Sequence, residues 1–551
     1  MRVTSHVHPT GPDHRARIPA NRVVLPALKA RSLPALLAQQ ALERHDHPAL
    51  RDAVGDLTYG ELYLQARQVA AGLRSAGVGQ DDPVLVMVGN NRQHVLAWLG
   101  ISFAGAVEVP VNTAAFGRTL RHVVEDTGAT TLILEAPFID NLAALEGLSK
   151  LETVVICGDA EPQYASLSQY RCLRFETLCA HPPLAPEQVQ RSGWDAMAIM
   201  YTSGTTGPSK GVCITHAHAY THCAPSDIGG VEPDDVALVS LPLFHIGGQW
   251  NGLYQAWIAG ATAALLDRFS ASRFWEDARR YGATYTTLLG AQASFLMRQP
   301  PRDVDTRHAI RHLTMLPLID NVDAFRERFG IAGVRTGYGI SEGSSPIGAG
   351  YNQASPGACG WLKPLYEARL VDEFDCEVPC GQVGELVLRS KEPWILMTGY
   401  HGLPEKTAEA MRNQWLHTGD LFRQDSSGQF YFTDRAKDSI RRRGENISSY
   451  ELEREACCHP AVTEAAAVAV KSEHTEEEIM IFAIAKSGMT LLAADLHAFL
   501  TARLPRYMAP RYVELVEDLP RTPTNRVQKH LLRAQGVTAR TWDAQEHGVG
   551  Q

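Results

Sequence analysis

The sequence predicts an α/β protein with a large N-terminal domain of parallel-rich sheets sandwiched by helices and a small, mobile C-terminal α/β domain. Segments with helical and strand periodicity alternate from Ser32 onward, the order that produces parallel sheets covered on both faces. A length of 551 residues exceeds what one core accommodates, so several compact units are expected. After Asp438 a further, shorter set of strands and helices follows, which predicts the second domain.

The composition is that of a soluble globular protein, with 45% hydrophobic and 21% charged residues. A formal net charge of −9 argues against nucleic acid or an anionic membrane as the main partner. No apolar run approaches the length of a membrane span, and the stretch of residues 99–111 is interrupted by Glu108. We therefore expect no nucleic-acid partner and no membrane partner. The sequence makes no prediction of the oligomeric state.

Ten cysteines in so long a chain do not form a disulfide framework. Neither Cys376 and Cys380 nor the adjacent Cys457 and Cys458 has the spacing of zinc ligands with partners nearby. We expect free thiols, which are typical of the reducing cytoplasm.

The elements of the large domain follow in chain order. Residues 1–31 carry scattered histidines and arginines without an apolar core and are expected to form a mobile arm. Helical periodicity covers residues 32–45 and 58–77, and the second segment reaches Gly77, a residue type common at helix ends. Strands are then expected at residues 83–88, 107–111, 131–134 and 154–157.

The stretch 196–212, AMAIMYTSGTTGPSKGV, joins a short apolar strand to a loop rich in glycine and hydroxyl side chains. Glycines let the backbone approach an anion and turn its N–H groups inward, while the hydroxyls add donors. Lys210 is the only charged residue in the stretch and supplies a point charge for a phosphate. The pattern differs from the common nucleotide loop, because Gly211 follows the lysine where Ser or Thr is usual.

The segment YTSGTTGPSKGV resembles the phosphate-binding signature of the adenylate-forming superfamily, which includes acyl-CoA synthetases, peptide-synthetase adenylation domains and luciferases. The resemblance covers about residues 32–533 and is greatest to the crotonobetaine/carnitine–CoA ligase-like branch. It implies a large nucleotide- and acid-binding domain at 32–436, a small swinging domain at 437–535 and a tail at 536–551. It also implies that Lys210 is catalytic and that the ATP phosphates are contacted by Thr202, Ser203, Gly204, Thr205, Thr206 and Gly207.

A second motif, VRTGYGISEG at 334–343, combines groups suited to a nucleotide. Tyr338 offers a flat ring for a purine, and Gly339 permits close approach of the backbone. Ser341 and Glu342 supply a hydroxyl and a carboxylate for phosphate and Mg²⁺. The motif is similar to the family's adenine and Mg²⁺ motif, with Ser341 where Thr is usual, and this resemblance makes Glu342 the expected metal ligand.

A third motif spans residues 415–453. Asp420, after Thr-Gly, resembles the carboxylate that holds both ribose hydroxyls, and Arg435 resembles the arginine that contacts ribose and phosphate. Lys437 falls at the family's hinge between the two domains. The SSG sequence at 426–428, between aromatic-rich runs, predicts a hairpin.

His245 lies at a strand end, followed by a turn at 245–248 and an apolar helix. A satisfied core histidine is the usual reading of such a residue, whereas the resemblance implies that it flanks and gates the acyl pocket. The helix 249–258 offers a mixed aromatic and polar lining, which favours a compact or aromatic acid over a long fatty chain: Gln249, Trp250, Asn251 and Tyr254.

The stretch 519–533, LPRTPTNRVQKHLLR, departs from the family, which has Gly-Lys where this chain has Asn525 and Arg526. That lysine bridges carboxylate and α-phosphate as the acyl-adenylate forms. Arg526 keeps the charge as a planar fork, and Lys529, three residues on, is the other candidate cation.

The implied reaction is ATP-dependent activation of a carboxylic acid as acyl-AMP with Mg²⁺, followed by transfer to a thiol, most simply CoA. Two alternatives stay open. One is a same-scaffold enzyme with another acid or nucleophile, either an amide-forming ligase or an ATP-dependent diazotase that activates nitrite for an aryl amine. The other is a non-catalytic nucleotide binder, against which the joint presence of three nucleotide motifs argues.

Overall fold

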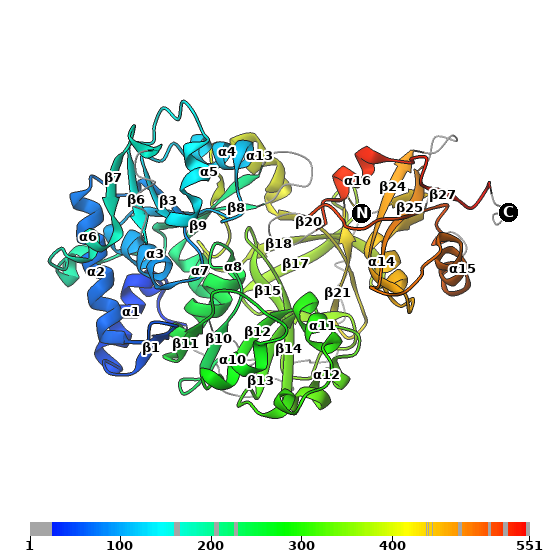
Figure 1. The fold of residues 1–551 in the computed structure, drawn as a ribbon, viewed down its shortest axis with the longest axis horizontal. Coiled ribbons are helices and arrows are strands. Elements are labelled where there is room, and N and C mark those ends of the chain that lie inside the picture. Colours follow the sequence, from blue (N-terminus) through cyan, green and yellow to red (C-terminus); the bar gives the residue numbers. More distant parts are fainter. Residues whose placement is uncertain are drawn as a thin grey trace, which may run out of the picture.

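The computed structural model describes residues 25–158, 166–202, 209–224, 230–436, 438, 440–442, 445–471, 477–504, 508–521 and 527–546. A large body contains two sheets with helices between and around them, and a smaller body is built from the end of the chain (Figure 1). The predicted α/β fold with a large N-terminal and a small C-terminal domain is confirmed.

One sheet of the large body has eight strands in the order β19-β9-β8-β4-β3-β5-β6-β7. The strands from β4 to β7 run parallel, and four of them reproduce the predicted strands, with ends that differ by no more than a residue. Their bounds are β3 Pro83–Met87, β4 Val107–Pro110, β5 Thr131–Glu135, β6 Thr153–Cys157, β7 Arg171–Arg174, β8 Ala196–Thr202, β9 Lys210–Thr215 and β19 Gly399–Tyr400.

The other sheet has thirteen strands in the order β17-β18-β20-β21-β16-β15-β14-β13-β12-β10-β11-β1-β2. Its parallel part runs from β14 to β1, and its antiparallel part extends toward the small body. The bounds are β1 Pro48–Arg51, β2 Asp56–Thr58, β10 Val236–Val239, β11 Thr262–Leu265, β12 Tyr285–Leu289, β13 His312–Leu316, β14 Gly333–Ile340, β15 Ser344–Ala349, β16 Ala358–Leu362, β17 Tyr366–Val371, β18 Val383–Ser390, β20 Leu416–Gln424 and β21 Phe430–Arg435. The β20–β21 pair is the predicted hairpin.

Helices cover both sheets of the large body. They are α1 Leu33–Glu43, α2 Tyr59–Ser75, α3 Arg92–Ala104, α4 Gly117–Thr127, α5 Ile139–Ala143, α6 Phe175–Cys179, α7 His216–Cys223, α8 Ile246–Gly248, α9 Gln255–Ala259, α10 Phe274–Arg280, α11 Gly290–Arg298, α12 Val322–Phe329 and α13 Pro404–Ala410. A capping box between Thr58 and Glu61 begins α2, satisfying backbone groups that a helix start leaves open. Helix α3 is buried along nearly its whole length, and its Trp98 stacks on Trp257 of α9.

A polar contact crosses the core between the two sheets. Glu108 of β4 is fully buried, and its two carboxyl oxygens accept hydrogen bonds from Gln249 Nε2 at 3.0 and 2.9 Å. Burial raises the pKa of Glu108 to about 8 and lowers that of the neighbouring His94 to about 4. Trp250 Nε1 donates to Gln249 Oε1 at 3.2 Å, which fixes the amide. At neutral pH the carboxyl group is therefore mostly protonated.

The predicted turn at His245–Gly248 is wrong in detail, because the helix already begins at Ile246. His245 is the N-cap residue, and its Nδ1 accepts a hydrogen bond from the Gly247 N–H at 3.1 Å. The chain continues through a π-helical segment, η6 (Gln249–Tyr254), into α9. Such π-helical turns are often found at functional sites.

The small body contains a four-stranded sheet in the order β24-β25-β26-β27 and a two-stranded one, β22-β23. Its elements are β22 Ile440–Arg442, β23 Glu445–Ile447, α14 Ser449–Cys457, β24 Val462–Lys471, β25 Glu477–Ala485, α15 Ala493–Arg503, β26 Tyr512–Leu515, α16 Lys529–Gln535 and β27 Trp542–Asp543. The prediction of a tail is wrong for residues 536–546. There β27 pairs with β26, and Asp543 forms a buried ion pair with Arg511 at 3.0 Å.

The predicted N-terminal arm is also too long. Residues 28–30 form a 3₁₀ turn, and Arg31 is buried, where its guanidinium pairs with Glu392. All ten cysteines are free thiols, as predicted.

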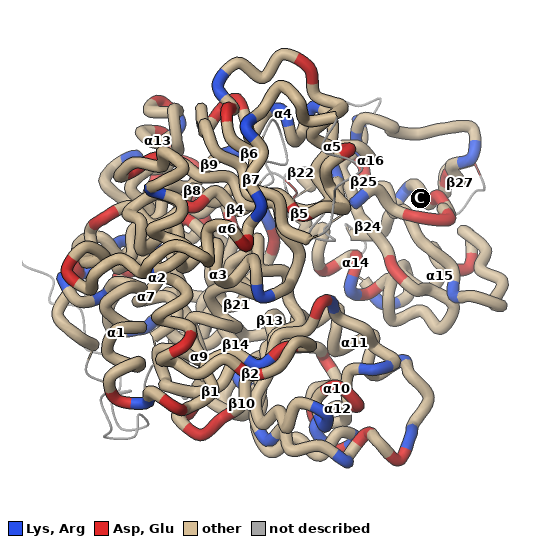
Figure 2. The backbone as a smooth tube through the Cα atoms, turned by 60° about the vertical axis from the view of Figure 1, so that its left-hand side comes forward, with Lys and Arg blue, Asp and Glu red and all other residues tan. Residues whose placement is uncertain are grey.

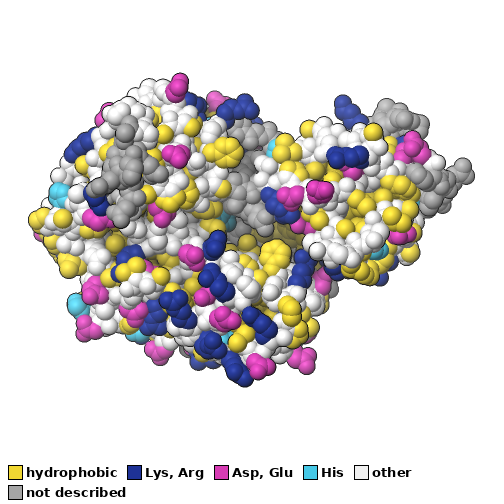
Figure 3. Space-filling model, in the orientation of Figure 1, with side chains coloured by type: hydrophobic (Ala, Val, Ile, Leu, Met, Phe, Trp, Pro, Cys, Tyr) yellow, Lys and Arg dark blue, Asp and Glu magenta, His cyan; other side chains and the backbone are white. Residues whose placement is uncertain are grey.

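Acidic and basic residues are interspersed along the backbone and over the visible face of the molecule (Figures 2 and 3). No single-sign surface of the kind that binds nucleic acid is visible on that face. In the described part of the chain, none of the helices combines the length and apolarity needed for a membrane span.

Candidate active site

The glycine-rich loop connects β8 to β9, which pair as antiparallel neighbours. Thr202 ends β8 opposite Lys210 at the start of β9, so the two predicted residues frame the loop. The predicted loop residues between them, Ser203, Gly204, Thr205, Thr206 and Gly207, lie outside the described residues. A Cβ atom on Gly211 would stand 2.6 Å from Ile199 Cγ2, so only glycine fits where the loop returns to the sheet.

Lys210 is joined to Glu342 through a tyrosine. The Lys210 ammonium lies 4.0 Å from the centre of the Tyr400 ring, and the Tyr400 hydroxyl donates to Glu342 Oε1 at 3.1 Å. Tyr400 is brought there by β19, which pairs with β9. Burial and the neighbouring Glu342 raise the pKa of Tyr400, so the phenol remains a donor. The two motifs that the sequence predicts to contact the phosphates therefore meet.

Tyr338, Asp420 and Arg435 are brought together from three strands. The Tyr338 hydroxyl donates to Asp420 Oδ2 at 2.7 Å, and Arg435 Nε lies 3.2 Å from Asp420 Oδ1. Burial first, and Asp420 second, raise the pKa of Tyr338. Asp420 is 2% exposed, held between a phenol and a guanidinium. Ser341, three residues after Tyr338 in the same motif, is buried as well.

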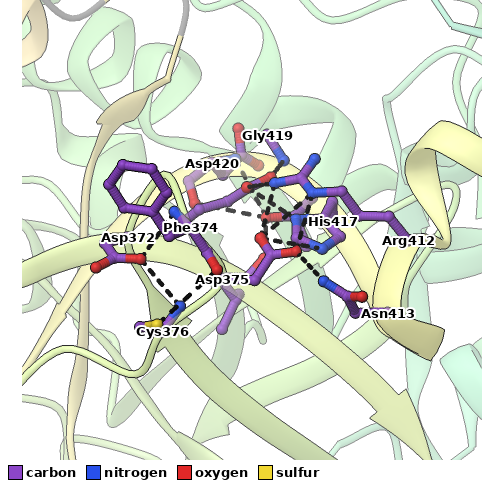
Figure 4. A network of polar contacts seen from close by, with 12 residues as sticks. Asp372, Phe374, Asp375, Cys376, Arg412, Asn413, His417, Gly419 and Asp420 are labelled. Atoms are coloured by element: carbon purple, nitrogen blue, oxygen red, sulfur yellow. Dashed lines mark hydrogen bonds and ion pairs between the residues drawn. The ribbon is translucent and has the colours of Figure 1, made fainter.

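A network of polar contacts fixes the backbone that carries Asp420 (Figure 4). Glu385 of β18 accepts from the Gly419 N–H at 2.9 Å and contacts His417 Nδ1 at 2.9 Å. Arg412 reaches both Glu385 and Asp375, at 3.2 and 3.1 Å. The hydrogen bonds from Arg412 hold the pKa of Asp375 below its usual range.

His245 and its surroundings lie on the other side of β14. His222 of α7 contacts Asn251 of η6 through Nε2 and Oδ1 at 3.2 Å. A Cβ atom on Gly339 would stand 3.3 Å from His222 Cε1, so this helix packs directly beneath the glycine. The electrostatic influence of His245 extends to His222, whose pKa is lowered to about 3, chiefly by burial. The histidine proposed as a gate therefore borders the region between β14 and the helices.

Lys529 lies inside the small domain. Its Nζ contacts Glu453 Oε1 at 2.7 Å and Ser449 Oγ at 2.5 Å. Ser449 in turn donates to Asp434 Oδ2 at 2.6 Å, at the end of β21. Lys529 is thus engaged at the junction of α14 and β21. The other candidate cation, Arg526, and the predicted hinge, Lys437, lie outside the described residues.

The Glu342 carboxylate suits a Mg²⁺ ion that is bound together with a nucleotide. Among the described residues no group of three or more His, Cys, Asp or Glu side chains is gathered to hold a metal. Mg²⁺ in nucleotide sites uses one or two carboxylates together with phosphate oxygens and water, and Glu342 is such a carboxylate. Its hydrogen bond from Tyr400 orients the carboxylate.

Sequence reasoning missed Tyr400, Glu385, Asp375 and Arg412. Tyr400 stands in a Gly-Tyr pair at a strand too short to be recognised from periodicity. The Glu385 side chain acts on a backbone N–H that lies 34 residues away in the chain.

Two family models match the chain. That of the AMP-binding enzyme covers residues 37–401, and that of the AMP-binding enzyme C-terminal domain covers residues 451–526. Among curated proteins, the crotonobetaine/carnitine–CoA ligase of Salmonella arizonae is 30% identical over 495 residues, 87% of this chain and 93% of the relative. The corresponding ligase of Salmonella typhi is equally similar, at 30% identity over the same shares.

Solved structures with the same fold include two aryl-CoA ligases. An anthranilate CoA ligase in complex with anthranoyl-AMP aligns with a TM-score of 0.83 and 25% identity, covering 93% of this chain and 98% of its own. A benzoate CoA ligase from Burkholderia xenovorans LB400 aligns with a TM-score of 0.79 and 25% identity, covering 91% and 99%.

Proposed function

The chain belongs to the AMP-binding enzyme family, and we propose that it joins a compact or aromatic carboxylic acid to CoA. It is an ATP-dependent, AMP-forming acid ligase of the acyl-CoA synthetase type. In the first half-reaction a carboxylate oxygen attacks the α-phosphorus of ATP, and the bond to the β-phosphate breaks to release pyrophosphate. In the second, the CoA sulfur attacks the acyl carbon and AMP leaves.

In our proposal the residues of the large domain position ATP and neutralise its charge. Asp420 accepts hydrogen bonds from the ribose hydroxyls, Arg435 neutralises negative charge beside it, and the Tyr338 ring packs on the adenine. Lys210 and the loop from Thr202 to Gly207 hold the phosphates. Mg²⁺ bound at Glu342 would neutralise charge on the phosphate oxygens. Electrostatic stabilisation of this kind is usually the largest contribution to catalysis.

The observation that carries the proposal is the meeting of Tyr338, Asp420 and Arg435. These residues come from two motifs, 334–343 and 415–453, and the sequence predicts the same nucleotide ligand for all three. Their joint geometry, at 2.7 and 3.2 Å around one buried carboxylate, suits a ligand with paired hydroxyls. The aryl-CoA ligase structures support a small aryl acid. Of the four residues predicted to line the pocket, Gln249, Trp250 and Tyr254 are instead buried in the core, and only Asn251 is half-buried.

The test is pyrophosphate exchange into ATP with a panel of acids that includes benzoate, anthranilate, crotonobetaine, carnitine and nitrite, followed by mass spectrometry for the CoA thioester. We expect exchange with at least one small carboxylic acid and a thioester only when CoA is present. Asp420→Asn should raise the KM for ATP at least ~10-fold, whereas Asn at the exposed Asp323 should not. Exchange with no acid would refute the proposal. Exchange with nitrite alone would mean that the enzyme activates nitrite and not a carboxylic acid.

A further inference from the structure

The end of β14 contacts different parts of the molecule on its two sides. An irregularity in the pairing of β14 with β15 lies between Tyr338 and Ile340, so the regular alternation of side chains is interrupted at Gly339. Tyr338 faces Asp420, and Gly339 faces α7. Although β14 lies in the middle of the sheet, Gly339 is exposed and Gly337 is only half-buried. The backbone of β14 is therefore accessible at Gly337 and Gly339, next to the motif that carries Glu342, and in the proposed reaction the acid binds beside it.

A lysine stands beside this end of β14, in the turn that follows β16. Lys363 donates from its backbone N–H to Pro346 O at 2.8 Å and from Nζ to Ser345 Oγ at 3.0 Å. Both acceptors belong to β15, the neighbour of β14. The Lys363 side chain is thus tied to the strand that borders the accessible end of β14.

The surroundings of the Lys363 ammonium contain no counter-charge that the structure describes. Its hydrogen-bond partner Ser345 is neutral, and no carboxylate of the described residues lies within ion-pair distance. Burial, and after it the nearby Arg335, lower the pKa of Lys363 to about 7. A half-buried amine without an anionic partner is only partly solvated, which favours the binding of an oxygen acceptor.

Two further polar groups face the same region. Gly339 lies between His222 and the residue that Lys363 contacts, because a Cβ atom there would stand 3.3 Å from His222 Cε1 and 3.5 Å from Ser345 Cα. His222 contacts Asn251, a half-buried amide on η6. The region thus offers an amine, an amide and a neutral imidazole, a set suited to an oxygen-bearing substituent.

We propose that Lys363 binds a second oxygen acceptor of the acid substrate, a carboxylate or a phenolic oxygen at the end remote from the carboxylate that is activated. This inference rests on the proposed function, because it assigns the substrate class of the same site. It makes Lys363 a specificity-determining residue.

The test compares benzoate with 3- and 4-hydroxybenzoate, isophthalate and terephthalate in pyrophosphate exchange. We expect the wild-type enzyme to have at least ~10-fold higher kcat/KM for one of the substituted acids than for benzoate. Lys363→Met keeps the length of the side chain and removes its charge, so it should abolish that preference while benzoate is still activated. Ser345→Ala, which removes the hydrogen bond and keeps the amine, should retain part of it.

A pH profile of the wild-type enzyme gives a readout that does not depend on folding of a variant. Above pH 7 the kcat/KM for the substituted acid should fall relative to benzoate, because Lys363 loses its proton. The other groups facing it do not change charge there: His222 stays neutral, Cys223 stays a thiol and Arg335 stays a cation.

Equal kcat/KM for benzoate and every substituted acid would overturn the inference, as would a Lys363→Met variant that loses all acids in the same proportion. A parallel pH profile for the two acid types would do the same. Absence of exchange with any acid is a different result, since it refutes the proposed function itself.

Discussion

Glu108 is buried between the two sheets of the large domain. Its replacement by Gln should make the protein more stable than the wild type, by a difference that grows as the pH rises. The pKa of Glu108 is raised from 4.5 to about 8 in the folded protein. Below pH 4.5 the carboxyl group is protonated in both states and contributes no pH dependence. Between pH 4.5 and 8 the unfolded chain loses this proton and the folded chain keeps it, so stability falls with rising pH. Above pH 8 the loss is complete.

The magnitude follows from the size of the shift. One pKa unit corresponds to about 1.36 kcal/mol, so the group costs on the order of 2 kcal/mol at pH 6 and 4 kcal/mol at pH 8. Glutamine cannot ionise, and its amide oxygen can still accept the hydrogen bond from Gln249. Expressed as melting temperature, Glu108→Gln should gain about 3–5 °C relative to wild type between pH 5 and pH 8.

The assay is thermal unfolding followed by fluorescence at half-unit steps from pH 5 to pH 8.5. The lowered pKa of His94, which lies 3.9 Å from Glu108, makes stability fall as pH drops below 6.5, in the opposite direction to the effect of Glu108, so the two contributions are told apart by their sign. Glu125→Gln, at a side chain 51% exposed, is the matched control and should show no pH-dependent difference. Parallel melting curves for wild type and Glu108→Gln across this range would refute the reasoning.

Three further predictions concern catalysis. Replacing Lys210 or Glu342 by Ala should lower pyrophosphate exchange at least ~10²-fold, because each substitution removes a charged side chain that is proposed to act at the ATP phosphates. Near-normal exchange in either variant would contradict the role proposed for that residue. Lys437→Pro fixes φ and should spare adenylate formation while transfer to CoA fails, measured as two separate half-reactions; equal loss of both would mean that this residue is not a hinge. Arg526→Ala should lower exchange and leave thioester formation from supplied acyl-AMP intact. Lys529→Ala should leave exchange nearly unchanged, because its ammonium is engaged within the small domain; the reverse pattern would make Lys529 the adenylation cation.

The parallel strands of the large domain could be predicted because buried strands appear as continuous apolar runs. The run predicted at 83–88 is β3, and the one at 154–157 is β6, with ends that differ by one residue. The packed C-terminal segment could not be predicted. Its strand β27 has two residues, and what holds it is the contact of Asp543 with Arg511, whose partner the sequence does not reveal.

The residues of the site also divide into those that a local sequence pattern predicts and those that act through contacts distant in the chain. Tyr338, Asp420 and Arg435 are recognisable because each stands in a motif whose residue types suit one task. Tyr400 and Glu385 act across distances in the chain, on Glu342 and on the Gly419 N–H, and no local pattern records such contacts. The roles assigned to Lys210 and His245 stay predictions, although the structure brings Lys210 toward Glu342 and places His245 at a helix start.

Asp434 and Arg435 are consecutive residues at the end of β21, and they bind different domains. Asp434 accepts hydrogen bonds from the N–H and the hydroxyl of Ser449 in α14, both at 2.6 Å, whereas Arg435 contacts Asp420. The Ser449 contacts thus lie one residue from Arg435, which contacts the carboxylate proposed for the ribose, Asp420. The end of β21 therefore joins the small domain directly to the residues proposed for the nucleotide, so a change in the position of one acts on the other through a single peptide unit.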